Sequence, residues 1–330
     1  MATCPARRAH SLSRAAVIMG SEHSQGESII TLEHASARLL PKPWGSHDLH
    51  PWSSLRLGTA AVGEIWFERT ETDAPDSALL LKLLFANEAL SIQVHPDDAF
   101  ARSIGLAHGK TEAWYILSAT SNAKVAVGLK WRPTTQQLRT SIEDGSVVDM
   151  VCWHPVRSGD IVFVPAGTIH AIGPGLVIAE IQQRSDATFR LFDFGRQREL
   201  HVDNAVAVAH AGPADAQTES RRLTDARTLL MACPYFVLER IDLAPESNWL
   251  LNAASETWLL VLSGHARVGP MSLSIGETAF LEADRATIQV GADRFSGLVA
   301  YVGTEVRRDL LRAPIGHPAG PSDHSLEVLS

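Results

Sequence analysis

The chain has 330 residues, of which 45% are hydrophobic and 20% are charged, and its formal net charge at pH 7 is -8. This length allows two domains or one elaborated domain, and the composition is that of a globular protein rather than a disordered one. The negative charge without a long basic run argues against a nucleic-acid partner, and no apolar run is long enough for a membrane-spanning helix, so we expect neither a nucleic-acid nor a membrane partner.

Residues 1–25 form the first predicted element, an N-terminal extension that we expect to be disordered. Its first twenty residues contain arginine and serine but no acidic residue, a composition also found in transit peptides. A disordered start, or a reading frame extended upstream of Met19, is favoured over a targeting segment.

Short runs of β-branched and aromatic residues, separated by turn residues, dominate the chain from residue 63 onward. Seven of these runs predict strands: GEIWFERT, ALLLKLLF, LSIQVHP, TEAWYILS, AKVAVGL, DIVFVPAG and LVIAEIQQ. Strands at such close spacing favour a sandwich or barrel over alternating strands and helices.

The stretch from Pro133 to Val148 interrupts this strand pattern. Leu138 and Ile142 lie four residues apart within TTQQLRTSIEDG, which predicts one short helix inserted between two barrel strands. The segments DNAVAVAH, near Asp203, and LTDARTLL are interpreted as helical or coil connectors.

An internal repeat suggests two related barrels. The run EAWYILS, which begins at Glu112, has a counterpart in ETWLLVLS, which begins at Glu256. Downstream of each run, a Gly-Asp or Gly-Glu pair at Gly159 and Gly276 opens a hydrophobic strand. We therefore expect a mainly β fold of two jelly-roll β-barrels, the first with the small helical insertion.

The predicted domain organisation follows from these patterns. Residues 26–209 form the first domain, the polar stretch 210–222 is a linker rich in Gly, Pro and Ala, and residues 223–312 form the second domain. Residues 313–330, rich in Pro, Gly and Ser, are expected to be a flexible tail.

The segment GDIVFVPAGTIH, residues 159–170, carries the sharpest motif. Its spacing is Gly, five residues, Pro165, one residue, Gly167, two residues, His170. A strand that ends in a Pro-Gly turn places the imidazole of the returning strand in the barrel mouth. This spacing resembles the second motif of the cupin superfamily, so we expect cupin-type barrels.

Three further side chains complete a candidate metal site with His170. Gln93 and His95 lie two apart on a predicted strand and therefore share a face, and Glu112 supplies a carboxylate from a neighbouring strand. This mixed oxygen and nitrogen set suits Zn²⁺ with an open coordination position, although Fe²⁺ or Mn²⁺ could occupy a similar set. A lone buried histidine is more often a hydrogen-bonded core residue, but the combination favours a metal.

The second repeat lacks these ligands. Glu282, Asp284 and Thr287 stand at the positions aligned with Pro165, Gly167 and His170. We therefore expect the second barrel to be degenerate and metal-free.

Several stretches resemble the type I phosphomannose isomerase (mannose-6-phosphate isomerase) family, particularly its short bacterial form: KPWGSHDL (42–49), GEIWFE (63–68), LSIQVHPDDAFAR (90–102), GKTEAWYIL (109–117), PAGTIHAIG (165–173) and EIQQRSDATFRLFDFGR (180–196). The second half resembles the family only in general pattern. The resemblance implies interconversion of mannose 6-phosphate and fructose 6-phosphate through an enediol, with one Zn²⁺ per chain and a hexose 6-phosphate as small-molecule substrate.

The resemblance also implies roles for nine residues. The zinc ligands fall on Gln93, His95, Glu112 and His170, the catalytic positions on Arg190, Lys110 and Glu180, and the substrate phosphate positions on Lys82 and Ser91. Thr111 departs from the family, since many relatives have proline between the lysine and the ligand glutamate.

Alternatives remain for several of these residues. Either Glu180 or Lys110 could be the base that takes the carbon-bound proton. Arg190 could instead pair with Asp193, and Lys82, which is costly inside an apolar run, could bind an anion or reach solvent at a strand edge.

Two neighbouring acidic residues have a structural interpretation. Asp97 and Asp98, which follow His95, are expected to cap the next helical turn.

The alternative functions are a non-catalytic sugar-binding cupin, an Fe²⁺ dioxygenase, and an isomerase of a different sugar. The three cysteines, Cys4, Cys152 and Cys233, are odd in number and widely spaced, which fits a reducing compartment and predicts a cytoplasmic protein. The sequence does not fix an oligomeric state.

Overall fold

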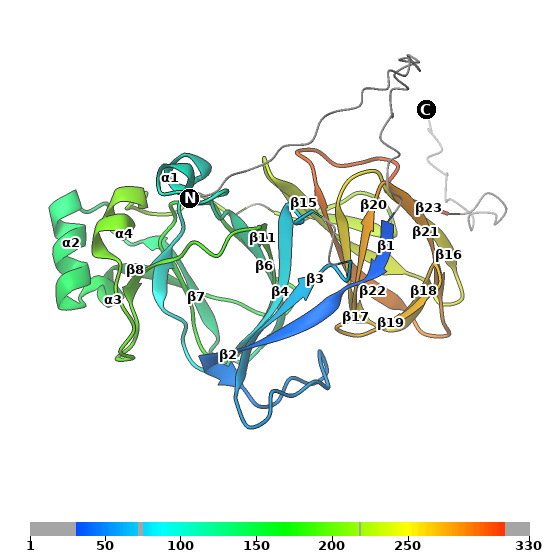
Figure 1. Ribbon diagram of the computed structural model, residues 1–330, viewed down its shortest axis with the longest axis horizontal. Helices are drawn as coiled ribbons and strands as arrows, with labels where there is room; N and C mark the ends of the chain where they lie inside the picture. Colours follow the sequence, from blue (N-terminus) through cyan, green and yellow to red (C-terminus); the bar gives the residue numbers. More distant parts are fainter. Residues whose placement is uncertain (1–30, 72–74, 218, 314–330) are drawn as a thin grey trace, which may run out of the picture.

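The computed structural model describes residues 31–71, 75–217 and 219–313. The predicted extension 1–25 and the predicted tail from residue 314 on lie outside this part of the chain. Strands dominate and helices are few, so the prediction of a mainly β fold is confirmed. Figure 1 shows the strands gathered in two β-sandwiches, with helices at the far end of the first.

The first sandwich contains a six-stranded and a five-stranded sheet. The larger sheet has, in spatial order, β2 (Ser36–Ser46), β3 (Val62–Glu68), β4 (Leu79–Ala86), β11 (Leu176–Gln183), β6 (Glu112–Ala119) and β9 (Ile161–Val164). The smaller sheet has β12 (Phe189–Phe192), β5 (Ile92–Val94), β10 (His170–Ile172), β7 (Lys124–Leu129) and β8 (Val151–Pro155). All seven strands predicted from the hydrophobic runs are present.

The helices within the described residues all belong to the first sandwich. They are α1 (Asp98–Ser103), α2 (Thr135–Asp144), α3 (Val147–Met150) and α4 (Val202–Val208). The predicted insertion is α2, between β7 and β8, and it begins with a capping box in which the Thr134 side chain accepts from Gln137 N. Leu138 and Ile142 are buried against the smaller sheet, as their spacing predicted. None of the helices within the described ranges is long and apolar enough to cross a membrane.

The second sandwich pairs a seven-stranded with a five-stranded sheet. The larger sheet has, in spatial order, β1 (Thr31–His34), β20 (Thr278–Glu282), β17 (Thr257–Ser263), β22 (Phe295–Val302), β15 (Phe236–Leu243), β14 (Arg227–Ala232) and β13 (Arg221–Arg222). The smaller sheet has β19 (Met271–Ser274), β18 (His265–Val268), β21 (Asp284–Val290), β16 (Asn248–Ala253) and β23 (Leu311–Arg312).

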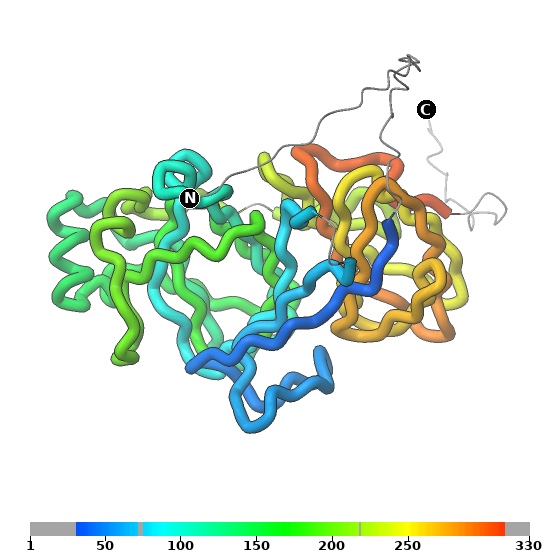
Figure 2. The backbone as a smooth tube through the Cα atoms, viewed as in Figure 1, coloured from blue at the N-terminus to red at the C-terminus, as the bar shows by residue number. Residues whose placement is uncertain are grey.

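Two strands of the second sandwich differ from expectation. The connector predicted at LTDARTLL is wrong from Arg227 on, because Leu230 and Met231 are buried against the first sandwich and the segment forms β14. The strand β1 falls within the range predicted for the first domain, yet it pairs with β20. Figure 2 shows the chain running from β1 in the second sandwich across to β2 in the first.

The two sandwiches share one topology, as the repeat suggested. The order β9-β6-β11-β4-β3-β2 corresponds to β20-β17-β22-β15-β14-β13, and β8-β7-β10-β5-β12 corresponds to β19-β18-β21-β16-β23. Backbone hydrogen bonds fix the register of this correspondence. Gly159 N donates to Ile116 O at 2.8 Å, and Gly276 N donates to Val261 O at 3.0 Å. Ile116 and Val261 are therefore equivalent residues.

The sequence alignment that matched Glu112 with Glu256 is wrong by one residue along the strand. With Ile116 equivalent to Val261, the counterpart of Glu112 is Thr257 rather than Glu256. Because successive side chains of a strand point to opposite faces, Glu256 and its neighbour Trp258 point out of the second sandwich.

The same shift applies at the other histidine position. Gly128 and Gly269 donate equivalent hydrogen bonds, of 2.8 and 2.9 Å, to the carbonyls of the residues before His170 and Ile288. The counterpart of His170 is therefore Ile288, which is buried in the apolar core of the second sandwich, and not Thr287.

The outward-facing residues of β17 join the two sandwiches. Trp258 is fully buried in an apolar core formed by the larger sheets of both sandwiches. Glu256 accepts hydrogen bonds from Ala78 N at 2.5 Å and from Leu79 N at 2.9 Å, at the start of β4, and from the Trp258 indole at 2.9 Å. This carboxyl therefore ties the second sandwich to the start of an interior strand of the first.

Replacing Glu256 with alanine is expected to lower the free energy of unfolding by about 2 to 4 kcal/mol, because backbone and indole N–H groups lose their acceptor. Urea denaturation of the purified protein measures this change. Glu143→Ala on the exposed face of α2 is the control, with an expected change within about 0.5 kcal/mol. Equal stability of the two variants would contradict the role assigned to Glu256.

Candidate active site and metal centre

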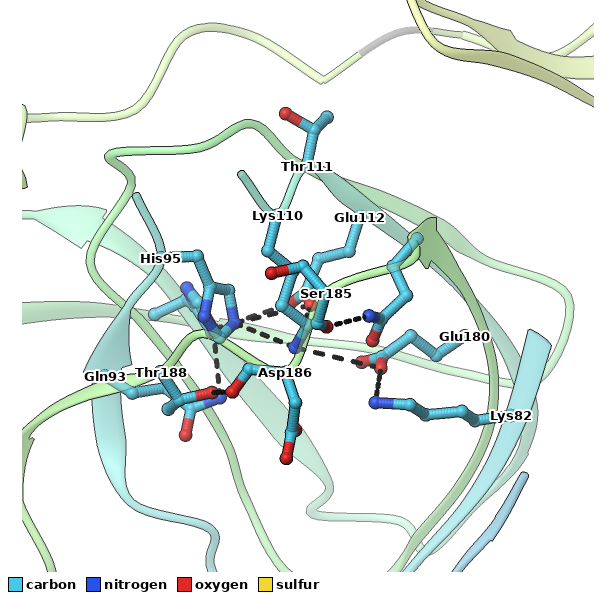
Figure 3. Close-up of polar contacts among 12 residues, drawn as sticks. Lys82, Gln93, His95, Lys110, Thr111, Glu112, Glu180, Ser185, Asp186 and Thr188 are labelled. Carbon is cyan, nitrogen blue, oxygen red and sulfur yellow. Dashed lines mark hydrogen bonds and ion pairs between the residues drawn. The ribbon is translucent and has the colours of Figure 1, made fainter. Parts of the chain in front are cut away.

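The four predicted metal ligands converge from three strands inside the first sandwich. Figure 3 shows three of them, Gln93, His95 and Glu112. Gln93 lies on β5 and His95 follows its last residue, while His170 begins β10 and Glu112 begins β6. Gln93 and His170 are direct neighbours across the β5–β10 pair. Residues distant in sequence thus meet, since β5 and β10 are neighbours in the smaller sheet and β6 belongs to the larger sheet of the same sandwich.

His95, Glu112 and His170 form a compact donor cluster. Their ligand atoms all lie within 4.8 Å of one another, and all three side chains are buried. Each Nε2 lies 3.4 Å from a carboxylate oxygen, His95 from Oε2 and His170 from Oε1 of Glu112. Neither carboxylate oxygen accepts a hydrogen bond of good geometry, although Oε2 forms an ion pair with Lys110 Nζ at 2.8 Å. Lone pairs that face each other in this way are stabilised by a cation held between them.

The other nitrogen of each imidazole is fixed by the backbone. His95 Nδ1 donates to Ala187 O and His170 Nδ1 donates to Thr168 O, both at 2.8 Å. These bonds place the proton on Nδ1, so each Nε2 presents its lone pair toward Glu112. Burial, followed by the charge of Lys110, lowers the pKa of His95 to about 3, and burial also lowers the pKa of His170. Both rings are neutral near pH 7, as ligation requires.

Gln93 lies beside this cluster but shows its amide nitrogen to it. Its Nε2 lies 3.3 Å from His170 Nε2, and its Oε1 accepts from Ser91 Oγ at 3.0 Å. Ligation through the amide oxygen therefore requires the amide group to turn over.

Lys110 contacts the candidate ligands directly. Its Nζ lies 2.8 Å from Glu112 Oε2 and 3.1 Å from His95 Nε2, and it lies 4.0 Å from Glu180 Oε1. Burial alone would lower the pKa of Lys110, but the Glu112 and Glu180 carboxylates outweigh it and raise that pKa. Burial alone would raise the pKa of Glu112, but Lys110 and the two histidines hold it well below its usual range.

A cleft of about 220 Å³ opens beside the cluster. It is lined by all five predicted catalytic and substrate-binding residues and by Gln93, namely Lys82, Ser91, Gln93, Lys110, Glu180 and Arg190. The structure thus brings together every site residue that the sequence predicted, in or directly beside one cleft.

Lys82, the lysine inside the apolar run, faces the interior of the sandwich. It lies directly opposite Glu180 on β11 and Trp66 on β3, with Nζ 3.4 Å from Glu180 Oε1 and 4.5 Å from the centre of the Trp66 ring. It is only 3% exposed, so the alternative of an edge lysine reaching solvent is wrong. Figure 3 shows Glu180 between Lys82 and Lys110.

Glu180 is a buried carboxyl with three donors around it. Besides the two lysines, the Trp114 indole donates to Oε2 at 3.1 Å. Burial and the neighbouring Glu112 charge raise the pKa of Glu180, and the two lysines oppose that rise.

Arg190 does not form the ion pair with Asp193 that the sequence left open. Asp193 pairs instead with Arg196 and Arg198, at 3.1 and 2.6 Å. Arg190 Nη1 donates to Glu199 O at 2.7 Å, and its buried Nε has no partner within the described residues. The guanidinium therefore keeps donor capacity at the cleft.

Sequence reasoning missed several residues of the cleft lining. The missed residues are Lys42, Glu64, Asp186, Thr188 and Arg198. Lys42 Nζ pairs with Glu64 at 3.0 Å, and the Trp66 indole donates to the same carboxylate at 2.6 Å. Their position in the sequence could have indicated Lys42 and Glu64, because they lie within the stretches 42–49 and 63–68 that carry the family resemblance.

The fold and the site together define a double β-sandwich protein with a candidate His-Glu-His metal centre beside a charged cleft. No family model matches the chain. The chain is 36% identical over 198 residues to the mannose-6-phosphate isomerase of Streptococcus mutans, covering 58% of this chain and 62% of that protein. It is 36% identical over 180 residues to mannose-6-phosphate isomerase ManA of Bacillus subtilis, covering 52% and 57%.

A third relative is covered more fully. The chain is 35% identical over 238 residues to a B. subtilis protein named "Probable mannose-6-phosphate isomerase GmuF", covering 66% of this chain and 74% of that protein. The chain therefore belongs to the mannose-6-phosphate isomerase family. The alignments with the first two relatives span less than two thirds of those proteins.

Solved structures agree on the fold. The mannose 6-phosphate isomerase from B. subtilis superposes with a TM-score of 0.72 at 24% identity, covering 83% of this chain and 100% of that one. The apo mannose 6-phosphate isomerase from Salmonella typhimurium gives a TM-score of 0.65 at 15% identity, covering 82% and 99%.

Proposed function

We propose that the chain is a zinc-dependent aldose-ketose isomerase that interconverts mannose 6-phosphate and fructose 6-phosphate through an enediol. The observation that carries this proposal is the cleft, in which a buried donor cluster lies beside a carboxyl, Glu180, held between two lysines. Family membership agrees with it, since the relatives described above carry that activity in their names.

The donor set fits a single zinc ion. Two neutral imidazoles and one carboxylate are a common zinc set, and the amide oxygen of Gln93 is a fourth candidate once the amide turns over. When bound, zinc supplies a Lewis acid that polarises sugar oxygens and stabilises negative charge on them. We propose His95, Glu112, His170 and Gln93 as the residues that hold it.

Geometry favours Glu180 over Lys110 as the base. Lys110 Nζ forms an ion pair with Glu112. The charges of Glu112 and Glu180 outweigh burial and raise the pKa of Lys110, so this group is an ammonium without a free lone pair for a proton. Glu180 accepts hydrogen bonds and keeps lone pairs at the cleft wall. In the proposed reaction Glu180 takes the proton from C2 of the open-chain aldose and returns it to C1, while the hydroxyl proton moves from O2 to O1.

The cations of the cleft suit the charges of the reaction. Lys110 and Arg190 can donate to the oxygens on which negative charge develops in the enediolate. We propose that Lys82 and Ser91 contact the substrate phosphate, with Lys42 and Arg198 adding positive charge to the cleft wall.

The purified protein is expected to convert mannose 6-phosphate to fructose 6-phosphate in a coupled assay. Activity should be lost on chelation and recovered when zinc is added, because the chelator removes the proposed Lewis acid. Metal content measured by mass spectrometry should follow the activity, with about one zinc per chain.

Two outcomes would separate the alternatives. Bound metal without turnover of any hexose phosphate would favour a sugar-binding cupin or an iron dioxygenase, and oxygen uptake with Fe²⁺ would select the latter. Turnover of another hexose phosphate at a higher kcat/KM would keep the chemistry and change the substrate.

A further inference from the structure

Three consecutive backbone amides hold the segment that carries Lys110. Each donates to a different residue: Gly109 N to Asp98 Oδ1 at 2.8 Å, Lys110 N to Pro96 O at 2.9 Å and Thr111 N to Gln183 Oε1 at 2.9 Å. The backbone on both sides of Lys110 is therefore fixed by groups outside its own strand. Thr111 donates where a proline could not, which accounts for how Lys110 is held despite the departure from the family pattern.

Gly109 brings this segment unusually close to the turn at residues 96–98. A Cβ added at Gly109 would lie 2.4 Å from the Asp97 carbonyl carbon and 2.6 Å from Asp98 N. Those contacts are with backbone and leave no room for a side chain. The segment thus rests directly against the turn that presents the Asp98 carboxylate.

Asp98 and Gln183 act as one unit. Asp98 Oδ1 accepts from Gln183 Nε2 at 3.0 Å in addition to Gly109 N. The expected helix cap at this turn is Asp97 alone, whose side chain accepts from Phe100 N at 2.8 Å. The prediction that Asp98 also caps the helix is wrong, because its carboxylate is used across the loop.

We propose that Asp98 and Gln183 are positioning residues that hold Lys110 Nζ within reach of Glu112 and Glu180. Neither touches the cleft itself, so their effect on the reaction passes through Lys110. The expected effect of these two residues on turnover rests on the proposed isomerase function. Their effect on the position of Lys110 does not depend on that function.

The second sandwich also reaches this unit. Tyr235, in the loop between β14 and β15, packs against the shared apolar core. Burial, then the charge and hydrogen bonding of Asp98, raise the pKa of Tyr235. The sandwich without the ligand set therefore contributes a side chain next to a residue that positions the catalytic lysine.

The test compares Asp98→Ala with Asp98→Asn, which keeps a side-chain oxygen able to accept from Gly109 and Gln183. Asp98→Ala is expected to lower kcat about 100-fold, since a displacement of about 1 Å costs that much, with KM for mannose 6-phosphate and zinc content nearly unchanged. Asp98→Asn should keep kcat within about fivefold of wild type. Asp97→Ala is the matched control, since it removes the helix cap of the same turn and should leave kcat unchanged.

Hydrogen exchange supplies a readout that does not require turnover. The peptide spanning residues 104–113 should lose protection in Asp98→Ala, and should keep it in Asp98→Asn and Asp97→Ala. Wild-type protection and kcat in Asp98→Ala would overturn the proposal, as would equal losses in Asp98→Asn and Asp98→Ala. If the wild type turns over no hexose phosphate, the proposed function fails, while the exchange measurement still decides whether Asp98 holds the segment.

Discussion

Replacing Glu112 with glutamine is expected to remove the bound metal and lower kcat/KM on the order of 10³-fold. Glu112 is the only anionic member of the proposed ligand set, and both of its oxygens face an imidazole at 3.4 Å. Glutamine keeps the size of the side chain but replaces one oxygen by an amide nitrogen, which cannot ligate. Metal content of the purified variant and kinetics at saturating zinc measure the two effects.

Glu256→Gln is the matched control for this experiment. It changes the same residue type in the same Glu-x-Trp pattern, but Glu256 points toward the start of β4 and not into a cleft. This variant is expected to keep the metal and the activity while losing stability. Full zinc content in Glu112→Gln would contradict the proposed ligand set.

Glu180→Gln is expected to lower kcat by about 10² to 10⁴-fold, the range attributed to a positioned acid or base. Glutamine can still accept the Trp114 hydrogen bond, but it cannot take a proton from carbon. Exchange of the C2 proton with deuterium in the solvent, followed by nuclear magnetic resonance, reports proton abstraction separately from product release. The exchange should disappear in this variant.

Lys110→Met separates the two candidates for the base. If Lys110 only stabilises charge, this variant should exchange the C2 proton slowly but measurably, while Glu180→Gln does not. The reverse result would assign proton abstraction to Lys110. Glu88→Gln, an exposed carboxylate that pairs with Arg196, is the control and should match wild type.

Much of the first sandwich could be predicted from its sequence because its strands alternate or are buried on both faces. The spacing of two residues placed Gln93, on β5, and His95, directly after β5, on one side, and the Pro-Gly turn before His170 defined its place. The resemblance to a known family added Lys110, Glu180 and Arg190, which the strand pattern alone does not mark as catalytic.

The face of a repeated motif could not be predicted in the same way. The sequences of the two repeats align best when Glu256 matches Glu112. The backbone hydrogen bonds show that the structural counterpart of Glu112 is the next residue, Thr257. A shift of one residue reverses inside and outside, so similarity of sequence led to the wrong face. The role of Asp98 was predicted wrongly for another reason. Its hydrogen-bond partners, Gly109 and Gln183, are distant in sequence, so the local pattern does not reveal them.

The pairing of β1 with β20 has a consequence for synthesis of the chain. Thr31 pairs with Glu282, about 250 positions later. At about 5 to 20 residues per second, β1 leaves the ribosome roughly 12 to 50 seconds before its partner exists. During that interval the first sandwich can form, but β1 cannot yet pair with β20 at the edge of the larger sheet of the second sandwich. Nascent chains halted before β20 should therefore expose an unpaired strand to chaperones, whichever activity the finished protein has.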